Sequence, residues 1–291
     1  MSRLLPFLAA LLSACAGAPE APQNPVSTGM KHALGEEVDC DVSARMASVW
    51  QERGLAKGRS HDKLSGPEDG VRDILSRSPE AASDILSTAT CGRVTPWTPA
   101  WSGTSARAAT TYDLLLAARG AQQVVAAHAE PSAAALSARQ AWMIANHLRH
   151  GVMMNQVMAI AAQNALLERE LTPRLASLPP EERTRLLVPM MMMAKAPPSI
   201  ADTVAVEADL AARAKPSDAA AWGGDDGLAD CREALPKLAE AARKVEALPV
   251  SDRPAAWSAS PAPGCEEVRR AVADVFANDA AALAKLNASM G

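Results

Sequence analysis

Apolar residues recur at helical spacing along most of the chain. Val42, Met46, Val49 and Trp50 follow one another by steps of four, three and one, which places them on one face of a helix. Similar patterns predict helices over residues 102–128, 152–171, 180–195, 199–214, 226–248 and 265–286. Shorter helices are expected after Ser65, after Ser78 and from Pro131, because a proline stands in the first turn of each.

Three further features of the sequence add detail to this helical pattern. The stretch 152–171 carries apolar residues on nearly every side, so we expect it at the centre of a bundle. Pro236 lies inside 226–248 and predicts a kink or a break near Leu235, because proline lacks a backbone donor and clashes with the preceding turn. Gly151 marks a kink or a joint just before 152–171.

The composition agrees with an all-α protein. Alanine is the most frequent residue, and aromatic residues make up only 3% of the chain, which suits helices better than large sheets. No pair of segments has the pattern of a β-hairpin. We predict packed helical hairpins, as an irregular bundle or a short α-solenoid, over residues 39–291. Possible sub-units of this body are 39–101, 102–215 and 216–291.

The N-terminus has the pattern of an export signal. A positive charge at Arg3 precedes a short apolar run, residues 4–12, and small residues follow. The run is too short for a bilayer core of about 30 Å, which needs about 20 apolar residues. Leu12-Ser13-Ala14-Cys15 resembles the lipobox of bacterial lipoproteins, in which a small residue precedes an invariant cysteine.

This resemblance implies a lipid anchor. In that family, residues 1–14 would be a signal peptide removed after Ala14. Cys15 would be acylated, for example with palmitate, and more than one acyl chain holds a protein stably on a membrane. Ala16 stands where enteric lipoproteins retained in the inner membrane have aspartate, which implies the periplasmic face of the outer membrane. The alternative is an ordinary cleaved signal with an unrelated cysteine.

Residues 15–38 are expected to form the lipidated cysteine and a flexible tether, since they are rich in Ala, Pro, Gln, Asn, Ser and Gly. About 22 flexible residues have a typical end-to-end distance of roughly 26 Å and a limit near ~75 Å. The body would therefore stay close to the bilayer. The 29 Lys+Arg and 33 Asp+Glu give a net charge of −4, which argues against a nucleic-acid partner. We expect a membrane, through the anchor, and another envelope protein as partners.

Four further cysteines, Cys40, Cys91, Cys231 and Cys265, predict two disulfides, because an even number in an exported protein is typical of disulfide pairing. Four cysteines permit three pairings. Cys40–Cys91 and Cys231–Cys265 are favoured, since each pair brackets a compact segment. A zinc site is the alternative, but no C-x-x-C is present and the spacings are wide.

A stripe of histidine and methionine is the most suggestive set for chemistry. Met143, His147, His150, Met154 and Met158 are separated by steps of four, three, four and four, so they share one face if a helix runs unbroken through Gly151. Imidazole and thioether together suit copper, which makes His147, His150 and Met154 candidate metal ligands. The favoured interpretation is packing, because methionine fills irregular gaps in cores.

No motif for nucleophilic, phosphate-binding or zinc-protease chemistry occurs, so we predict no catalytic residues and no cofactor. The favoured function is a non-catalytic, lipid-anchored envelope protein that presents a helical surface to a partner. One alternative is a periplasmic copper-binding protein using the His/Met stripe. A less favoured one is a cell-wall hydrolase, since its carboxylates can come from distant parts of a chain.

A second resemblance concerns the middle of the body. Leu114-Leu115-Leu116-Ala117-Ala118-Arg119, Glu130-Pro131 and Ala165-Leu166-Leu167-Glu168-Arg169 resemble pieces found in order in a loose class of helical bacterial proteins. The resemblance spans residues 112–188 and implies α-hairpin architecture, with no particular activity. Trp97 and Trp101 lie in a proline-containing loop that could bind a ligand, although folding down onto the body is favoured.

Overall fold

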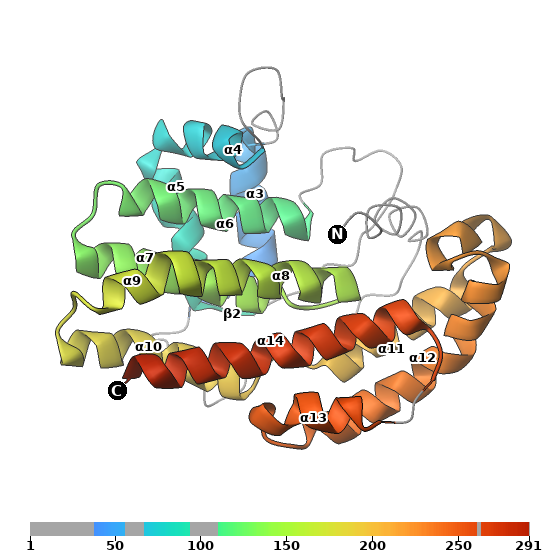
Figure 1. Cartoon of the computed structure of the whole chain (residues 1–291). Helices are drawn as coiled ribbons and strands as arrows, with labels where there is room; N and C mark the ends of the chain where they lie inside the picture. The colour runs from blue at the N-terminus through green and yellow to red at the C-terminus, as the bar shows by residue number, and fades with distance from the viewer. Residues whose placement is uncertain (1–37, 56–66, 94–109, 261–262, 291) are drawn as a thin grey trace.

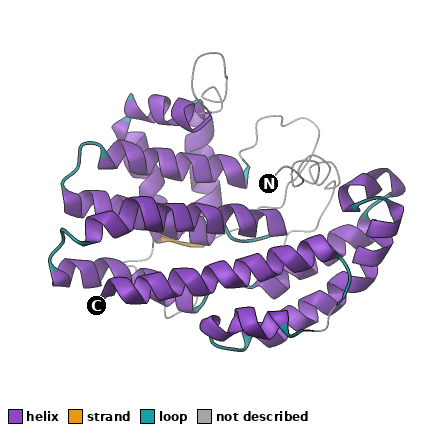
Figure 2. Cartoon of the chain, in the orientation of Figure 1, coloured by secondary structure: helices purple, strands orange, loops and turns teal. Residues whose placement is uncertain are grey.

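The computed structural model describes residues 38–55, 67–93, 110–260 and 263–290, and within them it confirms the all-α fold class (Figures 1 and 2). The α-helices are α3 (Val42–Glu52), α4 (Pro67–Ser76), α5 (Pro79–Ser87), α6 (Thr111–Ala126), α7 (Pro131–His147), α8 (Met153–Leu166), α9 (Thr172–Leu175), α10 (Pro180–Lys195), α11 (Ile200–Arg213), α12 (Asp225–Glu246), α13 (Arg253–Ser258) and α14 (Glu266–Met290). Short 3-10 segments, η2 (Thr88–Thr90), η4 (Pro216–Trp222) and η5 (Val250–Asp252), follow α5, α11 and α12.

The helix starts follow the capping chemistry in the sequence. Thr110 and Asp113 form a reciprocal capping box at α6, with Asp113 N donating to Thr110 Oγ1 at 3.2 Å. Ser199 caps α11 by accepting from Asp202 N at 3.1 Å. Proline occupies the first turn of α5, α7 and α10, where its missing N–H costs nothing.

Two of the predicted helices differ in detail from what the sequence led us to expect. The helix expected over 152–171 is interrupted, because α8 ends at Leu166 and a π-helical turn, η3 (Leu167–Leu171), follows. Pro173 disfavours the regular i to i−4 ladder, and Thr172 N instead donates to Leu167 O, five residues back. By contrast, α12 continues through Pro236 from Asp225 to Glu246, so the break considered near Leu235 is absent.

The buried apolar side chains form two cores. The first core is built by α3 to α10, and its largest members include Trp50, Trp142, Met143 and Ile144. The second core is built by α11 to α14, with Trp222, Trp257 and Phe276 among its members. The ring of Trp257 meets Phe276 edge-on, with the centroids 5.7 Å apart.

Two helices belong to both cores. α8 turns Ala159 and Leu166 toward the first core and Met153 and Ile160 toward the second. α14 crosses the front of the molecule in Figure 1 and packs against both α8 and α10. Its N-terminal half supplies Phe276 to the second core, while Leu286 near its C-terminus reaches the first. The junction of the cores therefore lies along α8 and α14.

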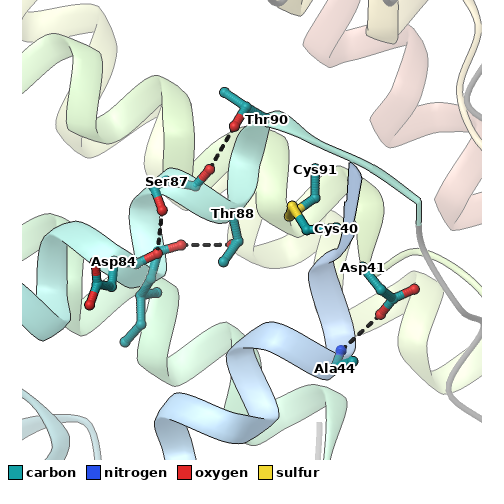
Figure 3. The surroundings of a disulfide bond; sticks show 9 residues. Cys40, Asp41, Ala44, Asp84, Ser87, Thr88, Thr90 and Cys91 are labelled. Atoms are coloured by element: carbon teal, nitrogen blue, oxygen red, sulfur yellow. Dashed lines mark hydrogen bonds between the residues drawn. A yellow bond between two sulfur atoms is a disulfide. The ribbon is translucent and has the colours of Figure 1, made fainter. Parts of the chain in front are cut away.

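The Cys40–Cys91 disulfide links the two ends of the segment that contains α3, α4 and α5 (Figure 3). Its two Cα atoms are 4.9 Å apart. It joins two short parallel strands, β1 (Val38–Asp41) and β2 (Cys91–Arg93), that the sequence analysis did not predict. The strands lie on either side of α3, α4 and α5 in the chain, so their pairing is non-local and has no hairpin pattern. Asp41, next to the bridge, caps α3 by accepting from Ala44 N at 2.8 Å.

The Cys231–Cys265 disulfide, with Cα atoms 4.5 Å apart, joins α12 to the start of α14 and confirms the predicted pairing. The preceding turn depends on Gly264, whose φ is +89°. A Cβ at this position would lie 2.8 Å from Ala234 Cβ and from Asp230 Oδ1, so a larger residue has no room. Asp230 also accepts from Cys265 N at 2.7 Å, which holds the turn in place.

A search for membrane-crossing helices within the described residues finds none of sufficient length and apolar character. The predicted signal peptide, residues 15–37 of the predicted tether and the Trp97/Trp101 loop lie outside the described residues, whereas Val38, the last residue assigned to the tether, belongs to β1.

Removal of the Cys231–Cys265 bridge should destabilise the protein. The cysteines are 34 residues apart in sequence, and closing a loop of that size contributes about 3–4 kcal/mol in the chain-entropy model. A Cys231→Ser/Cys265→Ser double variant should therefore unfold at lower urea concentration than the wild type. Peptide mapping of the unreduced protein should give a fragment linking Cys231 to Cys265. A fragment that links either of them to Cys40 or Cys91 would contradict the assigned pairing.

Candidate functional site

The His/Met stripe does not lie on one helix. α7 ends at His147, Gly151 takes φ +84°, and α8 begins at Met153. The required premise, an unbroken helix through Gly151, is therefore wrong, because the left-handed backbone at Gly151 turns the chain. Met143 and His147 are buried in α7, whereas Met154 and Met158 are half-buried in α8.

Both histidines of the stripe are held neutral by their surroundings. Burial lowers the pKa of His147 to about 4, with His150 adding to the effect and a hydrogen bond to the backbone of Ala89 opposing it. Burial, with Arg149 nearby, likewise lowers the pKa of His150 to about 4. Within the described residues, no three His, Cys, Asp or Glu side chains gather as ligands. The candidate ligands His147, His150 and Met154 do not share one helical face, and metal binding by them stays a prediction.

A buried ion pair occupies the region just after α7. Arg149 is only 2% exposed and Asp279, in α14, only 4%. Arg149 Nη1 donates to Asp279 Oδ1 at 2.6 Å, and Nη2 donates to Oδ2 at 2.9 Å, so the planar guanidinium engages both carboxylate oxygens. The two residues are 130 positions apart in sequence.

Two glutamines of α8 complete the surroundings of Arg149. Gln156 accepts from Arg149 Nε at 2.9 Å and returns a bond from its Nε2 to Arg149 O at 2.8 Å. Gln163 lies within 3.4 Å of Arg149 Nη1 and donates to Asn146 Oδ1 at 3.2 Å. A buried charge is tolerated when it is paired and well hydrogen-bonded, and these bonds pair the charge and engage four of the five N–H donors of Arg149.

The same polar cluster extends to α11. Gln156 Nε2 also donates to Thr203 Oγ1 at 3.1 Å. One turn further along α11, Glu207 Oε1 accepts from Met153 N, at the start of α8, at 2.7 Å. Glu207 is 1% exposed, and its second oxygen has no hydrogen-bond partner among the described residues. Burial raises the pKa of Glu207 to about 7, against the smaller opposing effect of the bond from Met153.

We call this set the polar junction: Asn146, Arg149, Gln156, Gln163, Thr203, Glu207 and Asp279. It lies where α7, α8, α11 and α14 meet, between the two cores. The sequence carried one overlooked signal of it. Gln156 and Gln163 are seven residues apart in α8, a spacing that places both on one face of the helix, inside a stretch otherwise dominated by apolar residues.

An open groove of about 700 Å³ is found on a different part of the molecule, between α4, α5 and the end of α6. Val124, Val125 and Pro79 contribute apolar surface to it. Its charged side chains come from α4, where Arg72 pairs with Asp69 at 2.9 Å. The groove thus combines apolar surface with an exposed polar rim, a combination that suits binding.

Comparison with models of known protein families, with curated proteins and with solved structures finds no match to this chain.

Because the pKa of Glu207 is raised, we predict that its contribution to the stability of the fold falls as the pH rises. An acid whose pKa is about 7 when folded and near 4.5 when unfolded stabilises the fold below pH 4.5, and this contribution is lost as the pH rises to about 7. Glu207→Gln removes the titration and keeps an oxygen for Met153 N. Relative to wild type, its free energy of unfolding should rise between pH 5 and pH 8, by on the order of 2–3 kcal/mol.

Urea unfolding at both pH values measures this change. His147 and His150 titrate in both proteins, so their opposite contribution, lost as the pH falls from 6.5 toward 4, cancels in the difference. The exposed Glu240→Gln serves as the control, since the pKa of Glu240 is lowered by Lys244 and the variant should gain nothing at higher pH. If the free energies of unfolding of Glu207→Gln and wild type differ by the same amount at pH 5 and pH 8, the raised pKa does not belong to Glu207.

Proposed function

We propose that this protein is a lipid-anchored protein of the bacterial cell envelope, on the periplasmic face of the outer membrane. The observation that carries the proposal is Leu12-Ser13-Ala14-Cys15, in which a cysteine follows a small residue directly after a short apolar run. The two disulfides support it independently, because disulfides persist in oxidising compartments such as the periplasm and are rare in reducing ones.

We further propose that the body acts by binding an envelope protein, without catalysis. Three groups with strongly shifted pKa values in the described residues, His147, His150 and Glu207, are largely or fully buried, and none of them lines the α4–α6 groove. Such groups, placed away from that groove, fit a structural role better than a chemical one. The groove offers apolar surface and a charged rim, as expected of a surface that binds a segment of a partner protein.

The anchor assigns a role to residues 15–38. A flexible tether of that length would let the body reach partners within roughly 26 Å of the membrane on average, and up to about 75 Å when extended. The protein would then search a thin layer beside the bilayer, which raises the effective concentration of any partner fixed in the same membrane.

Replacement of the anchoring cysteine tests the proposal. Cys15→Ser removes the sulfur that would be acylated, so the full chain should move from the membrane fraction to the soluble fraction after cell lysis. The measurement is an immunoblot of sedimented membranes and supernatant, with metabolic labelling by palmitate. Wild-type protein should carry label, and Cys15→Ser should not.

Intact disulfides in the Cys15→Ser protein, shown on a non-reducing gel, confirm that the variant has still been exported and folded. Sedimentation of Cys15→Ser at the wild-type level would rule out the lipobox.

A further inference from the structure

One face of α10 points away from the body and combines apolar and charged side chains. Glu181, Arg185, Val188, Met192 and Lys195 are exposed and follow one another by steps of four, three, four and three, so they form one stripe along the helix. Val188 is 39% exposed and Met192 37%, which places both among the most exposed large apolar side chains of the described residues. We call this set the α10 stripe.

The rest of α10 is firmly held, so the stripe is presented in a fixed orientation. Leu187, Met190 and Met193 are buried in the first core on the opposite side of the helix. Pro189 cannot donate to the carbonyl of Arg185, and Arg139 Nη1 from α7 approaches that oxygen at 3.5 Å instead. Figure 1 shows α10 at the edge of the molecule, beside the C-terminal end of α14.

Apart from Arg185, the charges on the stripe are arranged symmetrically about Val188. Glu181 lies seven residues before it and Lys195 seven residues after it. Neither forms an ion pair with another described residue. If a second α10 packs antiparallel with its own Val188 at the centre, each Glu181 meets Lys195 of the other copy. One helix pair then forms both complementary contacts.

The shape of the stripe is also complementary to a second, antiparallel copy. A depression of about 630 Å³ is lined by Pro180, Glu181, Thr184, Arg185, Val188 and Pro189. In the antiparallel arrangement, the residue opposite Thr184 is Met192 of the second copy, because both are four residues from Val188. Methionine is unbranched and adapts to irregular gaps, so each copy would insert Met192 into the depression of the other.

We propose that the α10 stripe binds a second copy of this chain, antiparallel, about a twofold axis at Val188. Such an isologous contact uses the same surface on both copies and closes without further growth. A helix of this length spans only about 24 Å, so the interface is small and weak on its own. This part of the inference depends on the proposed function, since two chains anchored in one bilayer meet at raised effective concentration. A bare anionic membrane surface would attract Arg185 and Lys195 but would offer no partner for Glu181, whereas a second copy offers Lys195 to it.

A single added cysteine tests the contact in the full chain in its own membranes. Helix axes packed about 9–10 Å apart leave facing Cα atoms about 4.4–5.4 Å apart, within the range of about 4.4–6.8 Å that a disulfide spans. Val188→Cys should therefore give a disulfide-linked dimer on mild oxidation, several-fold above wild type. Leu248→Cys, 40% exposed at the end of α12, is the matched control and should stay at the wild-type level.

Charge reversal then tests the antiparallel register. In the Val188→Cys background, Glu181→Lys alone or Lys195→Glu alone should lower the dimer yield several-fold, because like charges then meet at both ends. The combination Glu181→Lys/Lys195→Glu should restore it. A Val188→Cys yield no higher than that of Leu248→Cys, a cross-link to a protein of different mass, or no recovery in the combined variant would overturn the proposal. If Val188→Cys fails while the wild type still sediments with membranes, this contact is refuted and the anchor is not.

Discussion

The buried ion pair between Arg149 and Asp279 is the interaction on which the arrangement of the helices depends. An unpaired charge in a protein interior costs several kcal/mol, and breaking a buried pair typically costs about 3–5 kcal/mol. The guanidinium contacts both oxygens of Asp279, and two glutamines accept hydrogen bonds from its Nε and Nη1. α14 must therefore dock with Asp279 facing Arg149. That register also places Phe276 in the second core and Leu286 in the first.

The covalent links act within each core and leave the connection between cores to packing and the polar junction. Cys40–Cys91 belongs to the first core, and Cys231–Cys265 belongs to the second. Glu207 and Thr203 tie α11 to α8, and Asp279 ties α14 to Arg149. This connection buries the carboxylate of Glu207, whose second oxygen finds no hydrogen-bond partner in the described part of the chain. The outer surfaces, including the groove and the α10 stripe, are thereby presented on a body whose two halves are joined.

The sequence predicted what depends on local patterns. Periodic apolar residues and first-turn prolines located α10 at residues 180–195 and α11 to within a residue at each end, and the order of the cysteines favoured the correct pairs. It did not predict what depends on contacts between distant segments. The pairing of β1 with β2 and of Arg149 with Asp279 joins residues far apart, and no local pattern specifies such partners. The shared face of the His/Met stripe required an unbroken helix through Gly151, and the left-handed backbone at that residue ends the helical spacing there.

Hydrogen–deuterium exchange of wild type and Asp279→Asn tests most directly whether the polar junction joins the two cores. In the wild type, the slowest amides of α7 in the first core and of α12 in the second should exchange with the same opening free energy, as one cooperative unit. In Asp279→Asn, the buried Arg149 loses its counter-charge, so the two sets should separate and one core should open at lower free energy than the other. Equal loss of protection in α7 and α12, or no loss in either, would contradict the claim that this ion pair couples the cores.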